Sequence, residues 1–467
     1  MGLRIAILLA VMGGLALIGA IAFFAVPNRR GPRVAVVGAA AAVLVVATLV
    51  VFLAPIGAVT PAPVSPNLSL YLTGQICESV PPVFNPTCGS GPQTLLNLRA
   101  TDGATRWTAS ASGVSGKTNS SFLGAPILRD GVLYTIRGGA EPGDPAATLL
   151  ALRASDGGEI WRVTLEATPF AMDVADGQVF VLLKHQENAS LLRVFHASDG
   201  APAQQFTLPI FSDFTVADGL IIACDTYLFS SPSSSADFAA YHASDGSLAW
   251  SEFLPADAHT GPSVVPCALV VDDGVIYTAP YEGDTVSAIR LADGSPLWTA
   301  SLGFVAALGL SKDQLIVASA PNPYAAKTGQ PNTTTEKVTA LSLADGHFLW
   351  QREFATGPLN GTYSAGFIAV DEERTYVATT SALRSLRISD GATQWERKNS
   401  QSDGQFYLHP VVTQKTIFVD YGYSYGFEAG PTLRSPQPGH IFALNAATGE
   451  PYWNVSVYST GFVVGEV

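Results

Sequence analysis

The stretch Leu98-Arg99-Ala100-Thr101-Asp102-Gly103-Ala104-Thr105-Arg106-Trp107 contains the pattern that decides the fold of this chain. A large apolar residue stands four positions before the aspartate, an alanine two positions before it, and a tryptophan five positions after it. Alternating apolar and polar residues that run into Asp-Gly are the strongest short signal of a β-hairpin. The stretch therefore predicts a strand, a tight turn and a second strand.

The same pattern occurs eight times, and it contains every tryptophan of the chain. Seven copies place a Trp five residues after the Asp, or after Thr448 in the last copy: Trp107, Trp161, Trp250, Trp298, Trp350, Trp395 and Trp453. The eighth copy, at Asp199-Gly200, has Gln204 at that position, and Phe206 is its nearest aromatic residue. Such a register indicates one repeated structural unit.

A second, weaker hairpin precedes every copy but the first. Four of its turns also read Asp-Gly, namely Asp130-Gly131, Asp176-Gly177, Asp218-Gly219 and Asp273-Gly274. Two hairpins make a four-stranded antiparallel sheet, and the motif recurs every 43 to 58 residues, a spacing typical of propeller blades. We predict an all-β fold over residues 67–467, an eight-bladed β-propeller. The run 461–467 has no hairpin partner, so we expect it to become the innermost strand of the first blade and close the ring.

The repeated Leu-x-Ala-x-Asp-Gly-x-x-x-Trp pattern resembles the tryptophan-docking repeat of the pyrroloquinoline-quinone (PQQ)-like, or quinoprotein-type, propellers. The resemblance covers nearly all of residues 67–467. It implies that each Trp packs against a neighbouring blade, and the family's usual eight blades agree with the eight copies of the motif.

Two charge-free runs precede the propeller, residues 5–26 and 34–59. Each exceeds the roughly 20 apolar residues that cross a bilayer. Arg29, Arg30 and Arg33 crowd the short turn between them, so the positive-inside tendency places this turn in the cytoplasm and the propeller outside. A cleavable signal peptide is the rival interpretation of the first run, but the second run would then point the propeller inward. We therefore expect a transmembrane hairpin over residues 1–59, a Pro-rich linker over residues 60–66, and a multi-pass protein of the cell membrane with its propeller on the extracytoplasmic side.

The resemblance also offers an enzyme, a PQQ-dependent membrane-bound alcohol or sugar dehydrogenase. Many such enzymes carry adjacent cysteines beneath the quinone and a Ca²⁺ held by oxygen ligands. In this sequence no two cysteines are adjacent, and the acidic pairs Asp272-Asp273 and Glu372-Glu373 lack the alternating oxygen spacing of a Ca²⁺ loop. We therefore predict no catalytic, cofactor-binding or metal-binding residues, and keep PQQ with calcium for the enzyme alternative alone.

We interpret the histidines and cysteines as structural residues rather than as metal ligands or catalytic groups. His196 and His242 occupy a polar repeat position filled elsewhere by Arg, Ser or Asn, which favours a solvated strand position over a metal site. We expect one disulfide between Cys77 and Cys88, which bracket a Pro-rich insertion. A second is expected between Cys224 and Cys267, at the same end of adjacent blades.

The net charge of the chain restricts the classes of partner that it can bind. The chain carries 38 acidic and 25 basic residues, a formal charge of −13. Nucleic-acid binders need a basic face, so the acidity argues against that class. The favoured function is a non-catalytic binding or scaffold protein of the cell envelope, with a protein or glycan partner on the propeller loops. A ligand sensor is a third class, but the only predicted cytoplasmic segment between the two runs is a seven-residue turn.

Overall fold

A computed structural model describes this chain in sixteen stretches: 61–76, 94–110, 122–138, 147–167, 169–184, 189–209, 213–224, 238–252, 268–279, 285–303, 305–319, 335–355, 367–379, 381–399, 405–423 and 437–466. The two runs expected to form a transmembrane hairpin, 5–26 and 34–59, lie outside the described residues. No helix within the sixteen stretches is both long enough and apolar enough to be a membrane span.

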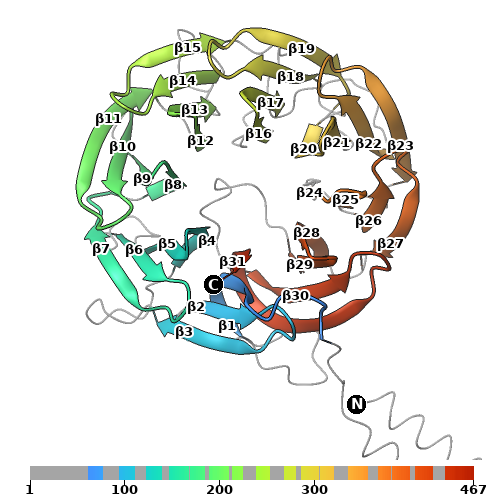
Figure 1. Ribbon diagram of the computed structural model, residues 1–467, viewed down its shortest axis with the longest axis horizontal. Coiled ribbons are helices and arrows are strands. Elements are labelled where there is room, and N and C mark those ends of the chain that lie inside the picture. Colours follow the sequence, from blue (N-terminus) through green and yellow to red (C-terminus); the bar gives the residue numbers. More distant parts are fainter. Residues whose placement is uncertain are drawn as a thin grey trace, which may run out of the picture. The chain divides into compact units, whose positions relative to one another are not determined.

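The described strands form eight four-stranded antiparallel blades arranged in a ring (Figure 1). Seven blades follow the predicted repeat from the innermost strand outward. Their strands are, in blade 2, β4 (Phe122–Arg129), β5 (Val132–Arg137), β6 (Thr148–Arg153) and β7 (Glu159–Thr164); in blade 3, β8 (Pro169–Ala175), β9 (Gln178–Lys184), β10 (Ala189–His196) and β11 (Pro202–Pro209); in blade 4, β12 (Asp213–Ala217), β13 (Leu220–Cys224), β14 (Phe238–His242) and β15 (Leu248–Glu252); in blade 5, β16 (Ala268–Asp272), β17 (Val275–Ala279), β18 (Thr285–Arg290) and β19 (Pro296–Ser301); in blade 6, β20 (Val305–Leu310), β21 (Gln314–Ser319), β22 (Thr335–Ser342) and β23 (Phe348–Ala355); in blade 7, β24 (Phe367–Val370), β25 (Arg374–Ala378), β26 (Ala382–Arg387) and β27 (Thr393–Lys398); and in blade 8, β28 (Gln405–Thr413), β29 (Thr416–Tyr423), β30 (Gln437–Asn445) and the first part of β31 (Pro451–Glu466).

Blade 1 joins the two ends of the described chain. Its outer three strands are β1 (Leu68–Ile76), β2 (Thr94–Arg99) and β3 (Thr105–Ser110). Its innermost strand is the second part of β31, in which Phe462 pairs with Leu72 and Glu466 pairs with Leu68. Earlier in β31, Trp453 still pairs with Ala443 as the outer strand of blade 8. The predicted closure by the C-terminal strand is therefore confirmed, and β31 makes blades 8 and 1 one continuous sheet.

The turns explain why these residues form hairpins. At the turns between the first and second strands, Asp130 and Gly131 have φ of 48° and 73°. Asp176, Asp218 and Asp273 have the same conformation as Asp130. Positive φ at both central residues is the type I′ geometry, whose twist matches that of the flanking strands and which Asp-Gly adopts readily.

The apolar core lies between blades rather than within any one of them. In β5, Leu133 to Arg137 are all buried, because the second strand of a blade is covered on both faces by its neighbours. Leu133 packs in a cluster with Tyr71 and Leu95 of blade 1. Each blade therefore requires the next one to bury its apolar side chains.

Residues 61–66 contact the propeller before the first strand begins. Ala62 is 3% exposed and belongs to the cluster that contains Leu70 and Trp453. Its backbone N–H donates to the carbonyl of Thr101 at 2.7 Å. The described part of the predicted linker is packed on the turns of the ring.

The two ends of the ring differ in their connections. One end holds the Asp-Gly turns, and we call it the short-turn end. Every gap between described stretches connects strand ends at the opposite end, and the longest of these connections are 77–93, 253–267 and 320–334. We call this the long-connection end.

Candidate functional site

Seven tryptophans join the blades in the same way. Each lies in an outer strand, and its indole Nε1–H donates to a backbone carbonyl in the next blade around the ring. The acceptors of Trp107, Trp161, Trp250, Trp298, Trp350, Trp395 and Trp453 are the carbonyls of Ala154, Ala197, Leu291, Leu343, Ile388, Ala446 and Ala100, at 2.6 to 3.0 Å. The last of these bonds joins blade 8 to blade 1, so the same contact is also made where the ring closes.

Each indole also covers the glycine of the neighbouring Asp-Gly turn, or of Thr448-Gly449 in the last copy. Gly157 has φ of +71°, and a Cβ placed on it would lie 2.7 Å from Cε3 of Trp107. Gly103 stands in the same relation to Trp453. The motif needs glycine at this position both for the left-handed backbone and for the close approach of the ring.

Blade 3 replaces the single tryptophan with two side chains. Gln204 Nε2 donates to the carbonyl of Ser244 in blade 4 at 2.8 Å. Phe206 lies two residues further along the same strand face and covers Gly246, where an added Cβ would meet Phe206 Cγ at 2.7 Å. The hydrogen bond and the ring contact of the missing Trp are therefore both present, from different residues.

The aspartate of the motif holds its own turn. In all eight copies the side-chain oxygen of the Asp, or of Thr448, accepts the backbone N–H two residues later, as Asp102 does from Ala104 at 3.1 Å. In four blades an arginine three residues before the Asp pairs with it, and Arg99 donates two hydrogen bonds to Asp102 at 2.8 and 2.6 Å. These bonds from Arg99 are the main reason that the pKa of Asp102 is lowered.

Histidines at this repeat position are solvated, as predicted. His196 and His242 are exposed at the short-turn end. His347 lies next to Asp345, with Nδ1 2.6 Å from the carboxylate, and both side chains are more than half exposed. Within the described stretches no group of three or more His, Cys, Asp or Glu is placed to hold a metal ion.

The predicted disulfides cannot be followed in the described part of the chain. Cys77, Cys88 and Cys267 lie outside it. Cys224 is the last residue of β13, but only its backbone is described, where it pairs with Asp213 and Phe238. Both disulfides therefore stay predictions.

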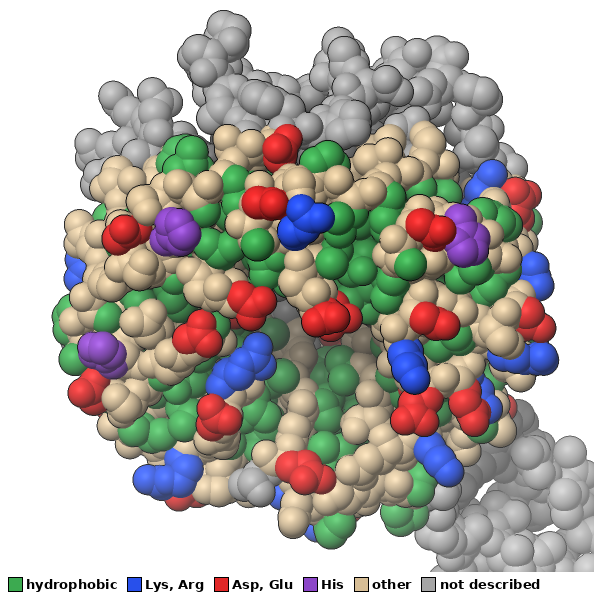
Figure 2. Space-filling model, turned by 45° about the horizontal axis from the view of Figure 1, so that its top comes forward, with side chains coloured by type: hydrophobic (Ala, Val, Ile, Leu, Met, Phe, Trp, Pro, Cys, Tyr) green, Lys and Arg blue, Asp and Glu red, His purple; other side chains and the backbone are tan. Residues whose placement is uncertain are grey.

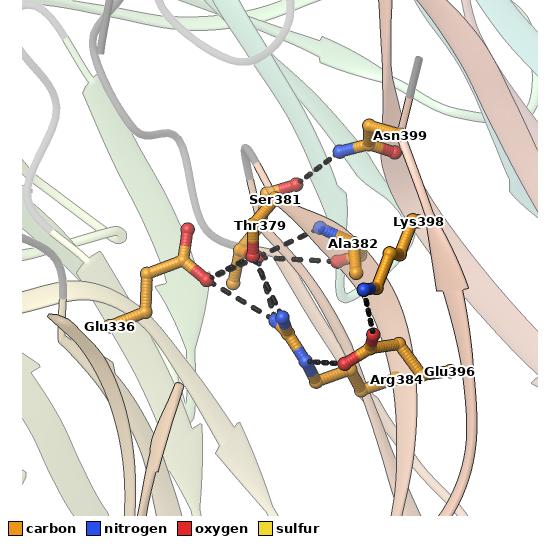
Figure 3. A network of polar contacts seen from close by, with 8 residues as sticks. All are labelled: Glu336, Thr379, Ser381, Ala382, Arg384, Glu396, Lys398 and Asn399. Carbon is orange, nitrogen blue, oxygen red and sulfur yellow. Dashed lines mark hydrogen bonds and ion pairs between the residues drawn. The ribbon is translucent and has the colours of Figure 1, made fainter. Parts of the chain in front are cut away.

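A buried ionic network joins blades 6 and 7 near the long-connection end (Figure 3). Arg384 is 5% exposed and lies between two carboxylates, Glu336 at 3.2 Å and Glu396 at 2.8 Å. Thr379 and Ser381 donate hydrogen bonds to Glu336 at 2.7 and 2.6 Å. Because the guanidinium and Glu336 are fully enclosed and hydrogen-bonded, the network fixes one geometry at this seam.

The outer rim exposes large apolar side chains on blade 2, at Ile160, and on the three consecutive blades 4 to 6. Those on blades 4 to 6 lie one or two residues before a Trp: Leu248 in blade 4, Leu297 in blade 5, and Phe348 and Leu349 in blade 6, with 57%, 42%, 54% and 39% of their surface exposed. We call this set the rim patch. Figure 2 shows how hydrophobic and charged side chains are interspersed over one face of the ring, around a central hollow. Exposed apolar side chains that recur on neighbouring elements indicate a contact surface.

Comparison with protein families matches this repeat. A family model described as "Outer membrane protein assembly factor BamB" matches residues 91–351 and, in an overlapping alignment, residues 190–455. The chain belongs to this family. The predicted resemblance to PQQ-like propellers is thereby confirmed.

Solved structures share the fold of this BamB-family chain at low identity. BamB from Moraxella catarrhalis is 13% identical with a TM-score of 0.50, covering 85% of this chain and 99% of its own. The dihydro-heme d1 dehydrogenase NirN, in complex with DHE, is 12% identical with a TM-score of 0.52, covering 88% and 78%. The quinohemoprotein alcohol dehydrogenase ADHIIG from Pseudomonas putida HK5 is 14% identical with a TM-score of 0.47, covering 76% and 72%. No curated protein matches the chain.

The inner wall of this BamB-family propeller does not fit PQQ with Ca²⁺ in its described part. PQQ is a polyanion, and Ca²⁺ takes about six to eight oxygen ligands. Within the described stretches no three or more carboxylates are gathered where they could hold such an ion, and the partly open pair of His409 and Asp420 in blade 8 supplies a single carboxylate. The carboxylate of Asp173 is already used, because it accepts the backbone N–H of Val216 at 2.8 Å and the hydroxyl of Thr215 at 3.1 Å. No reaction step through this cofactor is derived from these residues.

Proposed function

We propose that this chain is a membrane-anchored, extracytoplasmic propeller that binds a protein partner in the cell envelope and acts as a non-catalytic scaffold. The observation that carries the proposal is the rim patch, which supplies an apolar contact surface on three adjacent blades. Membership of a family described by an outer membrane protein assembly factor supports the same class of function.

The closed ring supports a scaffold role physically. Every blade is connected to the next by one of the seven Trp–carbonyl hydrogen bonds or by the Gln204–Phe206 pair, and strand β31 also joins blades 8 and 1. A surface that spans several blades keeps its shape when the seams between blades are fixed. A partner that contacts blades 4 to 6 would therefore lose little free energy to rearrangement of the propeller on binding.

The anchor in this proposal comes from the sequence. Residues 5–26 and 34–59 would cross the membrane, and the arginines between them would keep their connection in the cytoplasm. A scaffold tethered in this way meets its partner at a high effective concentration at the membrane.

Site-specific photocrosslinking in membranes tests the proposal. A photoreactive residue at Leu297 or Leu349 of the full chain should capture the same protein, whereas one at Gln394 should not. Gln394 is the matched control, because it is also exposed and stands directly before a Trp in blade 7. Equal capture at all three positions, or capture of nothing at Leu297 and Leu349, would contradict the rim patch as the contact surface.

The enzyme alternative needs a separate measurement. The detergent-solubilised full chain is incubated with PQQ and Ca²⁺, and quinone binding and dye-linked oxidation of alcohols and sugars are followed. The scaffold proposal expects no turnover. A stoichiometric quinone complex that oxidises substrate would overturn it.

A further inference from the structure

The innermost strand of blade 8 is interrupted by a bulge at His409. In the pairing of β28 with β29, Leu408 faces Asp420 and Val411 faces Phe418, so His409 and Pro410 together stand opposite Val419 alone. His409 has φ of +45°. A non-glycine residue avoids this region, and a residue before proline favours an extended backbone. Bulges of this kind re-aim a side chain, and strained backbone concentrates where a side chain has a task.

The bulge brings His409 beside a carboxylate of the same blade. Nδ1 of His409 lies 3.5 Å from Oδ2 of Asp420, and the side chains are 30% and 14% exposed. The ring of Phe367, from the innermost strand of blade 7, has its centroid 4.1 Å from that of His409. The imidazole is thus held between two blades on the inner side of the ring, with part of its surface open.

Asp420 has bonding capacity that the described residues do not use. Its second oxygen, Oδ1, is buried and has no hydrogen-bond partner within the described stretches. A buried carboxylate oxygen without a donor is costly, and native proteins supply such a group with water or an ion.

The separation of the two side chains, within reach of an ion pair, also matches that of two ligands of one metal ion. At 3.5 Å the pair is too far apart for a strong hydrogen bond. Two ligand atoms that each lie about 2.0–2.2 Å from a tetrahedral zinc ion are about 3.4 Å apart. A neutral imidazole and a carboxylate are both ordinary zinc ligands, and an apolar shell, here the ring of Phe367, is common around such sites.

We propose that His409 and Asp420 form a binding site for a zinc-like divalent transition-metal ion on the inner wall of blade 8. The two side chains supply two ligands, and water or a small ligand in the channel completes the tetrahedron. Such a site is open to exchange. The inference is independent of the scaffold function, because it uses none of the rim residues and requires no partner protein.

Cobalt and zinc titrations of the chelator-treated full chain in detergent test the site. Co²⁺ should bind with the visible absorption of a tetrahedral complex, and Zn²⁺ should displace it. His409→Gln and Asp420→Asn should each weaken Co²⁺ binding roughly tenfold or more. His242→Gln should leave it unchanged, because this exposed histidine also lies near an aspartate, Asp245, but not at the bulge.

The outcomes separate a metal site from an ordinary ion pair. Absence of a tetrahedral Co²⁺ band in the wild-type chain would overturn the proposal, and so would equal Co²⁺ affinity in the wild type, His409→Gln and Asp420→Asn. Thermal unfolding of each variant without metal shows whether it is folded. If Asp420→Asn does not fold, Asp420→Glu keeps the carboxylate and should bind Co²⁺ more tightly than His409→Gln does.

Discussion

Alanine at Gly157 should destabilise the propeller far more than alanine at Gly131 of the same blade. The two glycines have nearly equal φ, +71° and +73°. They differ in surroundings, since an added Cβ at Gly157 would lie 2.7 Å from Trp107, whereas nothing lies within 4 Å of one at Gly131. The pair therefore isolates the contact with the indole from the cost of the backbone conformation.

The size of the difference follows from two terms. Alanine in the left-handed region costs about 1–2 kcal/mol at either position. Forcing the indole of Trp107 away from Gly157 adds about 1–3 kcal/mol for overpacking. With an unfolding entropy of about 2.1 cal/mol/K per residue over some 400 residues, 1 kcal/mol lowers Tm by about 1 °C. We expect a decrease of about 1–2 °C for Gly131→Ala and about 2–6 °C for Gly157→Ala.

Differential scanning calorimetry of the two variants measures this difference. A double-mutant cycle with Trp107→Leu adds a second check, because Gly157→Ala should cost less once the indole is gone. Equal decreases in Tm for the two alanine variants, or strict additivity in the cycle, would refute the role given to the Trp–Gly contact.

Three other perturbations should have distinct effects. Deletion of residues 461–467 should lower Tm sharply, because it removes the innermost strand of blade 1. The same seven residues added as a peptide should restore part of the loss. An unchanged Tm would contradict the closure of the ring by this strand. Glu336→Gln should cost about 1–3 kcal/mol in urea unfolding, because Arg384 then keeps only the carboxylate of Glu396 at 2.8 Å. Glu336→Leu combined with Arg384→Met should cost less, because the guanidinium and the buried carboxylate are removed together. Arg99 lowers the pKa of Asp102, so the pairing of the two side chains stabilises the fold above the ordinary carboxyl pKa near 4. This stabilisation is lost as the pH falls through the lower pKa that Asp102 has in the folded protein. The urea midpoint of the wild type should therefore decrease between about pH 5 and pH 3, and it should decrease by less in Arg99→Gln.

The repeat could be predicted because its decisive contacts connect fixed positions. Trp107, Gly157 and the carbonyl of Ala154 all belong to the motif, so a constant register in the sequence becomes a constant contact in space. The closing strand was predictable for a similar reason, since a propeller of four-stranded blades left Phe462 and its neighbours without a partner.

The buried ionic network could not be predicted in this way. Glu336 and Arg384 are 48 residues apart and come from different blades. A charged residue within a strand is ordinarily taken to face solvent. Strands inside a propeller blade are covered on both faces, so the alternation of apolar and polar residues does not show there which side chains are exposed. The available sequence signal is Arg384, a charge whose neighbours in the strand are apolar or small.

The site at His409 was missed for a different reason. The sequence separates His409 from Asp420 by a turn and about half of each flanking strand, and no metal-binding spacing results. What brings the side chains together is the bulge, which shifts the register of β28 against β29 by one residue. A His-Pro pair inside an apolar strand was the available signal, because proline is rare in the interior of a sheet and marks a bulge when it occurs there.

Two features depart from the repeat, the Glu336–Arg384 network and the bulge at His409, and neither is needed to form the ring. The motif contacts, with Gln204 and Phe206 in place of a Trp in blade 3, already join every pair of blades, and blades 4 and 5 are joined without a buried ion pair or an inner-strand bulge among their described residues. The Glu336–Arg384 network and the strained His409 are therefore not required by the architecture, and each costs free energy that an apolar residue in a regular strand would not. Both occur at successive seams, between blades 6 and 7 and between blades 7 and 8. Register shifts of the innermost strand also occur in blades 2, 3 and 6, but among the described residues only the shift in blade 8 includes a non-glycine residue of positive φ. The strained backbone at His409 therefore accords with the metal site proposed for blade 8, whereas the buried Glu336–Arg384 network, in the third strands of blades 6 and 7, fixes the geometry of the seam beside it.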